Sequence, residues 1–240
     1  MPTAPKWIND ALEKIAPSML RTVKVEEIFY LNANIKKVRL RGDFSALHFA
    51  PGFTISFRVS PTESRHYTIS NVDDSARAIE FIAHIHSNAV GAQYINSLIP
   101  GDEKIKLAVL GSDKQYDPKV ERQIIFGDET SLSLMSSFLP YLQQNNHPYQ
   151  FLIELDDENC DIPEKLGLKN YRVYTKNNIF RDKDQIHTIP ELSDDVWCDA
   201  NIVLTGNVQS IQNFRKVLKE NRHEGKIFAK GYWLEGKKGL

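Results

Sequence analysis

Two different patterns of apolar residues divide this chain. From residue 23 to 110 the apolar residues form six short runs, and several of these alternate apolar and polar side chains, as half-buried antiparallel strands do. After about residue 120 continuous apolar runs alternate with helical segments, which is typical of a parallel sheet with helical crossovers. We therefore predict a β plus α/β protein, a six-stranded antiparallel barrel followed by a parallel-sheet domain.

Turn residues set the limits of the expected elements. The barrel strands are predicted at 23–31, 35–42, 54–60, 65–72, 78–86 and 102–110, with a short helix at 89–98. The second domain is predicted to have strands at 123–129, 149–156, 171–176, 201–207 and 226–233, and helices at 131–144, broken at Pro140, and at 208–221. The predicted organisation is an N-terminal helix (7–16) and lead-in at 1–22, the barrel domain at 23–112, a polar linker at 111–122 and the α/β domain at 120–240.

Charge and composition exclude several classes of function. The formal net charge is −1, so nothing global favours nucleic acid or an anionic membrane as a partner. The chain lacks both a signal-peptide pattern and an apolar run of about 18 residues, so we expect no membrane insertion. Cys160 and Cys198 have neither metal-type nor redox-type spacing, and a cytoplasmic location is the simplest expectation.

The segment RHYTIS (65–70) is the first candidate for ligand binding. On a strand, Arg65 and Tyr67 share one face, and His66 and Thr68 share the other. The Arg65 guanidinium could pair with a pyrophosphate, Tyr67 could lie against an aromatic ring system, and Thr68 could hydrogen-bond a ring nitrogen. The alternative is a plain strand with one aromatic core residue, and the strand alone favours that alternative.

Two glycines lie near the starts of predicted helices, where backbone N–H groups can approach phosphates. Gly91 lies in the segment NAVGAQYINS (88–97), and Gly127 follows a buried strand in FGDETSLS (126–133). The second segment could equally be a simple strand-to-helix turn with Thr130 as the N-cap.

His84 and His86 form a His-x-His pair on one strand. This spacing can bind a metal ion, but the sequence offers no obvious third ligand. We therefore predict no metal site.

The order of these segments resembles the ferredoxin–NADP reductase superfamily, and more closely the siderophore-interacting protein family, a branch of FAD-dependent ferric-siderophore reductases. The resemblance covers about residue 20 to the end. RHYT (65–68) is similar to the flavin-binding Arg-x-Tyr-Thr signature, FGDET (126–130) to the Gly-Asp-Glu-Thr motif, and KGYWLEGKKG (230–239) to the carboxyl-terminal Gly-Tyr-Trp signature. The chain departs from the family pattern at Ser70, at SLSL (131–134) and at Leu234.

The resemblance implies FAD bound by the barrel and NADH or NADPH bound by the second domain. The residues expected to bind the two cofactors are Arg65, His66, Tyr67, Thr68, His84, His86, Gly91, Ala92, Gln93, Gly127, Asp128, Glu129, Thr130, Gly206, Tyr232 and Trp233. No residue is expected to act as a catalytic acid or base, because flavin itself accepts a hydride and gives up single electrons.

The resemblance also implies a ferric siderophore as substrate and leaves ferredoxin open as an electron donor. Lys230, Lys237 and Lys238 could attract an anionic chelate, although solvated surface lysines are the simpler interpretation. The choice of nucleotide stays open, because the acids at 156–158 would repel a 2′-phosphate whereas Lys176 and Arg181 would attract one. Two other functions also stay open: a general NAD(P)H–flavin reductase for a protein or quinone acceptor, and a non-enzymatic FAD-binding protein.

Overall fold

The computed structural model describes residues 5–7, 10, 20–45, 47–86, 89–111, 115–176 and 179–237. The chain forms two compact units, Met1–Asp113 and Lys114–Leu240. Most of the expected N-terminal helix at 7–16 lies outside the described residues, as does Lys238. Among the described residues, no helix combines the length and apolar character needed to cross a membrane.

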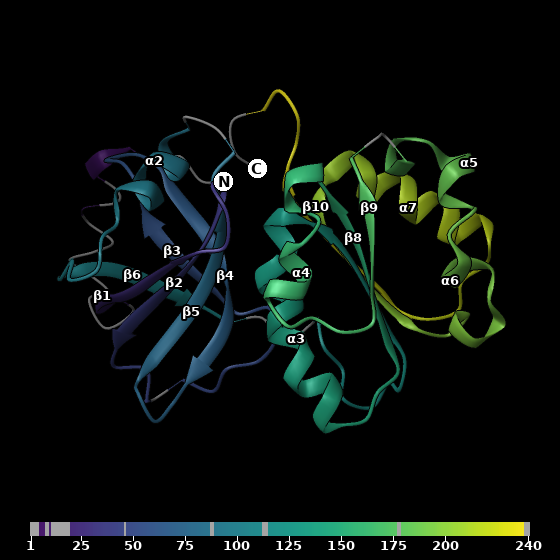
Figure 1. Ribbon diagram of the computed structural model, residues 1–240, viewed down its shortest axis with the longest axis horizontal. Coiled ribbons are helices and arrows are strands. Elements are labelled where there is room, and N and C mark those ends of the chain that lie inside the picture. Colours follow the sequence, from purple (N-terminus) through teal and green to yellow (C-terminus); the bar gives the residue numbers. More distant parts are fainter. Residues whose placement is uncertain are drawn as a thin grey trace. The chain divides into compact units, whose positions relative to one another are not determined.

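The first unit is a closed antiparallel barrel (Figure 1). Its elements are β1 (Leu20–Tyr30), β2 (Ile35–Gly42), β3 (Thr54–Arg58), β4 (Ser64–Asp73), β5 (Ala78–His84), α2 (Val90–Ser97) and β6 (Ile105–Leu110). The strand order is β1-β2-β5-β4-β3-β6, and the β1–β6 pairing closes the barrel. The six predicted strands and the intervening helix are all present, so the predicted barrel is confirmed.

Alternation along the strands builds the core of the barrel. Val38 and Leu40 on β2 are fully buried, and the intervening Arg39 stays partly exposed. Phe57 and Phe81, from β3 and β5, meet inside the barrel with their ring centroids 5.6 Å apart. The period-two pattern of the sequence thus places one side of each strand in the core.

The second unit is a five-stranded, fully parallel sheet in the order β11-β10-β7-β8-β9. Its strands are β7 (Gln123–Asp128), β8 (Tyr149–Leu155), β9 (Tyr171–Thr175), β10 (Asn201–Asn207) and β11 (Ile227–Trp233). Its helices are α3 (Leu132–Gln144), α4 (Ile162–Lys165), α5 (Lys183–Ile186), α6 (Pro190–Ser193) and α7 (Val208–Glu220). Figure 1 shows α3 and α4 on one side of the sheet and α5 and α7 on the other. The predicted parallel-sheet domain is therefore confirmed.

The predicted break at Pro140 is wrong, because α3 runs through this residue to Gln144. A proline inside a helix removes one backbone hydrogen bond and costs about 3 kcal/mol. Phe138 and Leu142, on either side of it, are fully buried. Burial of two large apolar side chains stabilises the helix by an amount comparable to that cost.

Candidate functional site

The barrel brings Arg65 of β4 against Gly91 of α2. A Cβ atom added to Gly91 would lie only 2.8 Å from Arg65 Cγ, so the stem of the arginine occupies the space that any larger residue would need. Tyr67 Oη donates a hydrogen bond to the Gly91 carbonyl oxygen at 3.5 Å. Three residues that the sequence analysis selected from two separate segments, 65–70 and 88–97, therefore meet in the barrel unit.

The helix that begins beside Arg65 has an uncapped N-terminus. The N-cap residue of α2, Ala89, provides no side-chain cap, and the first turn contains no acidic residue. Its first amide N–H groups have no partner within the helix. Ala89 and Gln93 are exposed, and Ala92 is half-buried. A helix end of this kind is suited to a phosphate group.

The Arg65 guanidinium is held in place by its own strand. Nη2 donates to Glu63 Oε1 at 3.2 Å, and Nη1 donates to the Ser64 carbonyl oxygen at 2.9 Å. The Arg65 side chain is only 16% exposed. Its orientation is therefore defined by the protein alone, as a preorganised anion-binding group requires.

Tyr67 lies against the aromatic residues of the barrel. Its ring centroid is 5.9 Å from that of Phe57 and 5.2 Å from that of Phe81. Burial raises the pKa of the Tyr67 phenol well above its usual value, so the hydroxyl stays neutral. Thr68 is buried and His66 is exposed, so the two residues expected on the same face of β4 differ in burial, and their expected contact with a cofactor stays a prediction.

His84 and His86 lie side by side at the end of β5, with ring centroids 5.0 Å apart. Within the described part of the first unit, no further metal-ligating side chain joins the pair. Their expected contact with a cofactor remains a prediction.

In the second unit, Gly127 is required by close packing of the chain on itself. A Cβ atom at this position would run into the side chain of Ser131. Thr205 Oγ1 lies 2.8 Å from Ser131 Oγ and 3.1 Å from the Phe126 carbonyl oxygen. The glycine therefore allows the turn after β7 to pack directly onto β10.

Asp128 joins three segments of the second unit. Its Oδ1 accepts hydrogen bonds from the Thr130 backbone N–H, at 2.9 Å, and from the Thr130 hydroxyl. Its Oδ2 accepts from the Asn207 backbone N–H at 3.0 Å and from Trp233 Nε1 at 2.7 Å. Burial raises the pKa of the Asp128 carboxyl above its ordinary value, but four donors favour the ionised form.

Gly206 packs directly against the same carboxylate. Its φ of +97° lies in the region that favours glycine, and a Cβ atom would collide with the Asp128 side chain. The Asp-Glu-Thr segment, the end of β10 and the carboxyl-terminal Gly-Tyr-Trp segment are thus parts of one packed arrangement. Asp128, not Thr130, supplies the cap of the turn at Glu129–Ser131.

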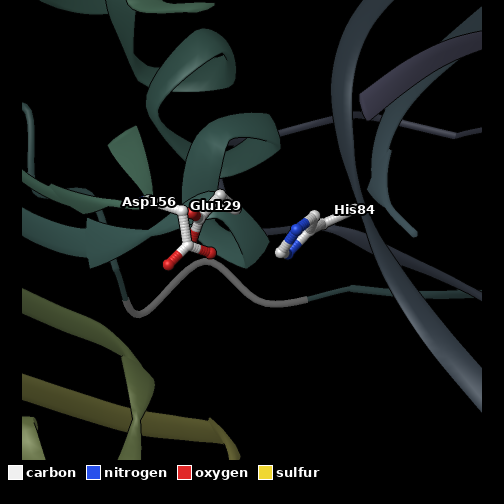
Figure 2. A group of neighbouring side chains, drawn as sticks. All are labelled: His84, Glu129 and Asp156. Carbon is white, nitrogen blue, oxygen red and sulfur yellow. The ribbon is translucent and has the colours of Figure 1, made fainter. Parts of the chain in front are cut away.

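Glu129 is also bound by the protein itself. It is 1% exposed, and its Oε1 accepts hydrogen bonds from the Asp156 backbone N–H at 2.8 Å and from Asn159 Nδ2 at 3.0 Å. Lys176 Nζ lies 2.6 Å from Glu129 Oε2 and 3.1 Å from Asp156 Oδ2. Figure 2 shows the two carboxylates side by side after β7 and β8; His84, also labelled there, belongs to the first unit. Lys176 is therefore already paired with two acids.

The tail residues occupy the end of β11. Tyr232 and Trp233 are half-buried, whereas Lys230 and Lys237 are exposed. Lys230 Nζ lies 5.8 Å from the centre of the Tyr232 ring. Exposure of both lysines fits solvated surface residues as well as an electrostatic contact with an anion.

The sequence analysis missed Glu154, the residue paired with Asp128 across β7 and β8. Glu154 is 5% exposed, and its Oε2 accepts a hydrogen bond from Ser210 Oγ at 3.2 Å. Burial is the main cause that raises the pKa of Glu154 to about 7, and the nearby charge of Asp128 adds to it. The available indication was an acid enclosed by apolar residues, Glu154 between Ile153 and Leu155 in the strand 149–156, because a buried acid needs a specific reason to be there.

Solved structures share this arrangement of barrel and parallel sheet. The siderophore-interacting protein SipS from Aeromonas hydrophila superposes with a TM-score of 0.73 at 15% identity, over 92% of this chain and 93% of that one. A siderophore utilization protein from T. fusca gives 0.70 at 20% identity, over 92% and 95%. The chain has the fold of the siderophore-interacting proteins.

The same fold is found in a domain of a nitric oxide dioxygenase. The flavohem-like FAD/NAD binding domain of nitric oxide dioxygenase from Vibrio cholerae gives a TM-score of 0.68 at 18% identity, over 88% of this chain and 98% of that domain. No protein-family model matches the chain, and a search of curated proteins found no match. The resemblance to siderophore-interacting proteins is therefore supported by the fold alone.

Proposed function

We propose that this protein is an FAD-dependent reductase that passes electrons from a nicotinamide nucleotide to a ferric siderophore. In this proposal the barrel binds FAD and the parallel-sheet unit binds the nucleotide. The observation that carries the proposal is the convergence of Arg65, Tyr67 and Gly91 beside the uncapped start of α2.

This end of the barrel fits the diphosphate of FAD. The guanidinium of Arg65 can form charge-assisted hydrogen bonds with phosphate oxygens, and the first N–H groups of α2 add the positive end of a helix. Gly91 keeps the two elements close, and no acid in the first turn of α2 opposes an anion. Thr68 and His66 lie on the other face of β4, where they would contact a different part of the cofactor.

FAD, when bound, supplies the conversion between a two-electron donor and a one-electron acceptor. The chain itself has to bind and orient the reactants. Oxygen-rich ligands hold Fe(II) more weakly than Fe(III), so reduction of the chelate would release the iron. A ferric siderophore as the acceptor rests on the shared fold and on the exposed Lys230 and Lys237.

The carboxyl ends of β7, β8 and β10 are the expected place for the nucleotide, because ligands of parallel sheets bind beyond these ends. Of the two donors, we propose NADH. Lys176 is shared between Glu129 and Asp156, so its charge is already balanced and offers little attraction to a 2′-phosphate.

A general flavin reductase is the second candidate, because the FAD/NAD binding domain of a nitric oxide dioxygenase shares the fold. One assay separates the two. Protein reconstituted with FAD is mixed with NADH, NADPH or reduced ferredoxin, and each mixture receives either a ferric siderophore or a neutral quinone. Fe(II) trapped by a colorimetric chelator supports the proposal. Quinone reduction without Fe(II) supports the general reductase, and no reduction by any donor contradicts both.

A further inference from the structure

Two buried carboxyl groups lie next to each other on one face of the parallel sheet. Asp128 and Glu154 are partners in register across β7 and β8, and both are almost completely buried. Asp128 receives four hydrogen bonds, whereas Ser210 Oγ provides the one donor to Glu154 among the described residues. Two neighbouring carboxylates in a buried site disfavour double ionisation. Because Glu154 has fewer hydrogen-bond donors than Asp128, Glu154 is the member of the pair that is protonated more readily.

The other groups around Glu154 come from β9 and α7. Tyr174 is its partner in register on β9, and burial raises the pKa of that phenol to about 12. Lys176 and Arg181 act on Glu154 through their charges alone. Lys176 is paired with Glu129 and Asp156, and Arg181 contacts Gln209 and Glu235. No cation is therefore paired directly with Glu154 in the described part of the chain.

Glu154 also lies under the start of α7, the helix that follows β10. Asn207 caps this helix by accepting hydrogen bonds from the N–H groups of Gln209 and Ser210, and Ser210 in turn donates to Glu154. This helix end differs from the start of α2, because it is capped and faces acids. It can favour an anion only when Glu154 is neutral.

We propose that Glu154 takes up a proton when the diphosphate of a dinucleotide binds at the carboxyl ends of β7, β8 and β10. This inference rests on the proposed binding of a nicotinamide nucleotide by the second unit. A neutral Glu154 leaves Asp128 as the one negative charge of the pair. An ionised Glu154 adds a second charge in a site of low dielectric and repels the diphosphate.

The probe is ADP-ribose, because its diphosphate does not titrate near neutral pH, whereas a phosphomonoester has a pKa near 6. Burial and the charge of Asp128 raise the pKa of Glu154 to about 7. A bound anion raises the pKa of a neighbouring acid, and each unit of that shift corresponds to a tenfold change in affinity. We expect the wild type to bind ADP-ribose roughly tenfold more tightly at pH 6 than at pH 8.5.

Glu154→Gln tests the residue directly, because glutamine stays neutral at every pH. This variant is expected to bind at pH 8.5 about as tightly as the wild type does at pH 6. Glu164→Gln is the matched control: Glu164 is an exposed acid of α4 in the same unit, and the variant should retain the pH dependence. A pH dependence that survives in Glu154→Gln would overturn the inference.

A measurement on the wild type alone guards against a variant that folds poorly. Calorimetry at pH 7 in two buffers of different ionisation enthalpy gives the number of protons taken up with ADP-ribose. Uptake of a fraction of a proton is expected. Binding without uptake overturns the role of Glu154 and leaves the nucleotide site standing. No binding of ADP-ribose at pH 6 or pH 8.5 would overturn the proposed function and this inference together.

Discussion

Trp233 Nε1 donates a hydrogen bond to Asp128 Oδ2 at 2.7 Å, across 105 positions of sequence. This bond joins the turn after β7 to the end of β11, and the same oxygen also accepts from the Asn207 backbone N–H. The Gly-Asp-Glu-Thr and Gly-Tyr-Trp segments are therefore directly connected. The two segments lie far apart in sequence, but both help to hold the end of β7 against the end of β11.

Trp233→Phe tests the strength of this connection. The variant keeps an aromatic ring but removes one donor from a buried carboxylate, which should lower the free energy of unfolding by about 1–3 kcal/mol. Urea unfolding of the full chain measures the effect. Trp197→Phe is the control, because the Trp197 indole makes no hydrogen bond among the described residues. Equal stability of the two variants would show that the bond is not important.

Arg65→Ala tests the diphosphate site of the barrel. Loss of a charge-assisted contact should weaken FAD by about 1.5–3 kcal/mol, with the fold retained. The dissociation constant of FAD, from flavin fluorescence during titration, measures this change. Arg41→Ala removes an exposed arginine of the same barrel and should leave FAD affinity near that of the wild type. Wild-type affinity in Arg65→Ala would remove the main support for flavin binding at this position.

Lys36→Met is expected to stabilise the barrel. Lys36 is 1% exposed, and its Nζ has no hydrogen-bond partner among the described residues. Its Nζ lies over the Tyr30 ring, 5.5 Å from the ring centre. Burial lowers the pKa of the Lys36 ammonium. Removal of an unsatisfied buried group should raise the free energy of unfolding by about 1–3 kcal/mol at pH 7.

The pH dependence of that gain has a definite sign. Because the folded pKa of Lys36 lies below the unfolded value, the unfolded chain binds more protons, and wild-type stability rises with pH up to the unfolded pKa. The advantage of Lys36→Met should therefore shrink between pH 7 and pH 9.5. Lys24→Met, at an exposed surface pair, should show neither the gain nor the trend. Destabilisation by Lys36→Met at pH 7 would contradict the expectation.

Asp156→Asn tests the preference for NADH. This change removes one of the two carboxylates that share Lys176, so the lysine should attract a 2′-phosphate more strongly. The KM for NADPH should fall roughly two- to fivefold relative to that for NADH, as expected for a partly exposed charge pair. Steady-state kinetics with both donors measure the ratio. Asp161→Asn, which alters an exposed pair with Lys165, should leave the ratio unchanged.

Local sequence patterns were sufficient to predict the two architectures. Alternating residues such as Val38, Arg39 and Leu40 indicate half-buried strands, and the run 123–129 indicates a buried parallel strand. Both patterns depend on which faces of an element are apolar, and this information is local. Pro140 shows the limit of local reasoning, since packing of Phe138 and Leu142 overrides the preference of proline to end a helix.

The candidate residues of the barrel could also be predicted from the sequence, but their contact with one another could not. Arg65 and Gly91 belong to segments that only strand pairing and the placement of α2 bring together. The sequence suggested a phosphate-binding glycine at each of two positions. The tertiary structure distinguishes them. Gly91 borders an uncapped helix start, whereas the space beside Gly127 is occupied by the Ser131 side chain.

By itself, the sequence determined the two fold classes, the order of the strands along the chain and the segments that carry the family resemblance. Only the tertiary structure decided which polar side chains face solvent and which satisfy one another. Asp128, Glu129 and Lys176 could all have faced a nucleotide, yet each is bound by groups from other segments of the second unit. The physical reason is that buried charges must find partners, and those partners come from distant parts of the chain that only the folded sheet brings within hydrogen-bond distance.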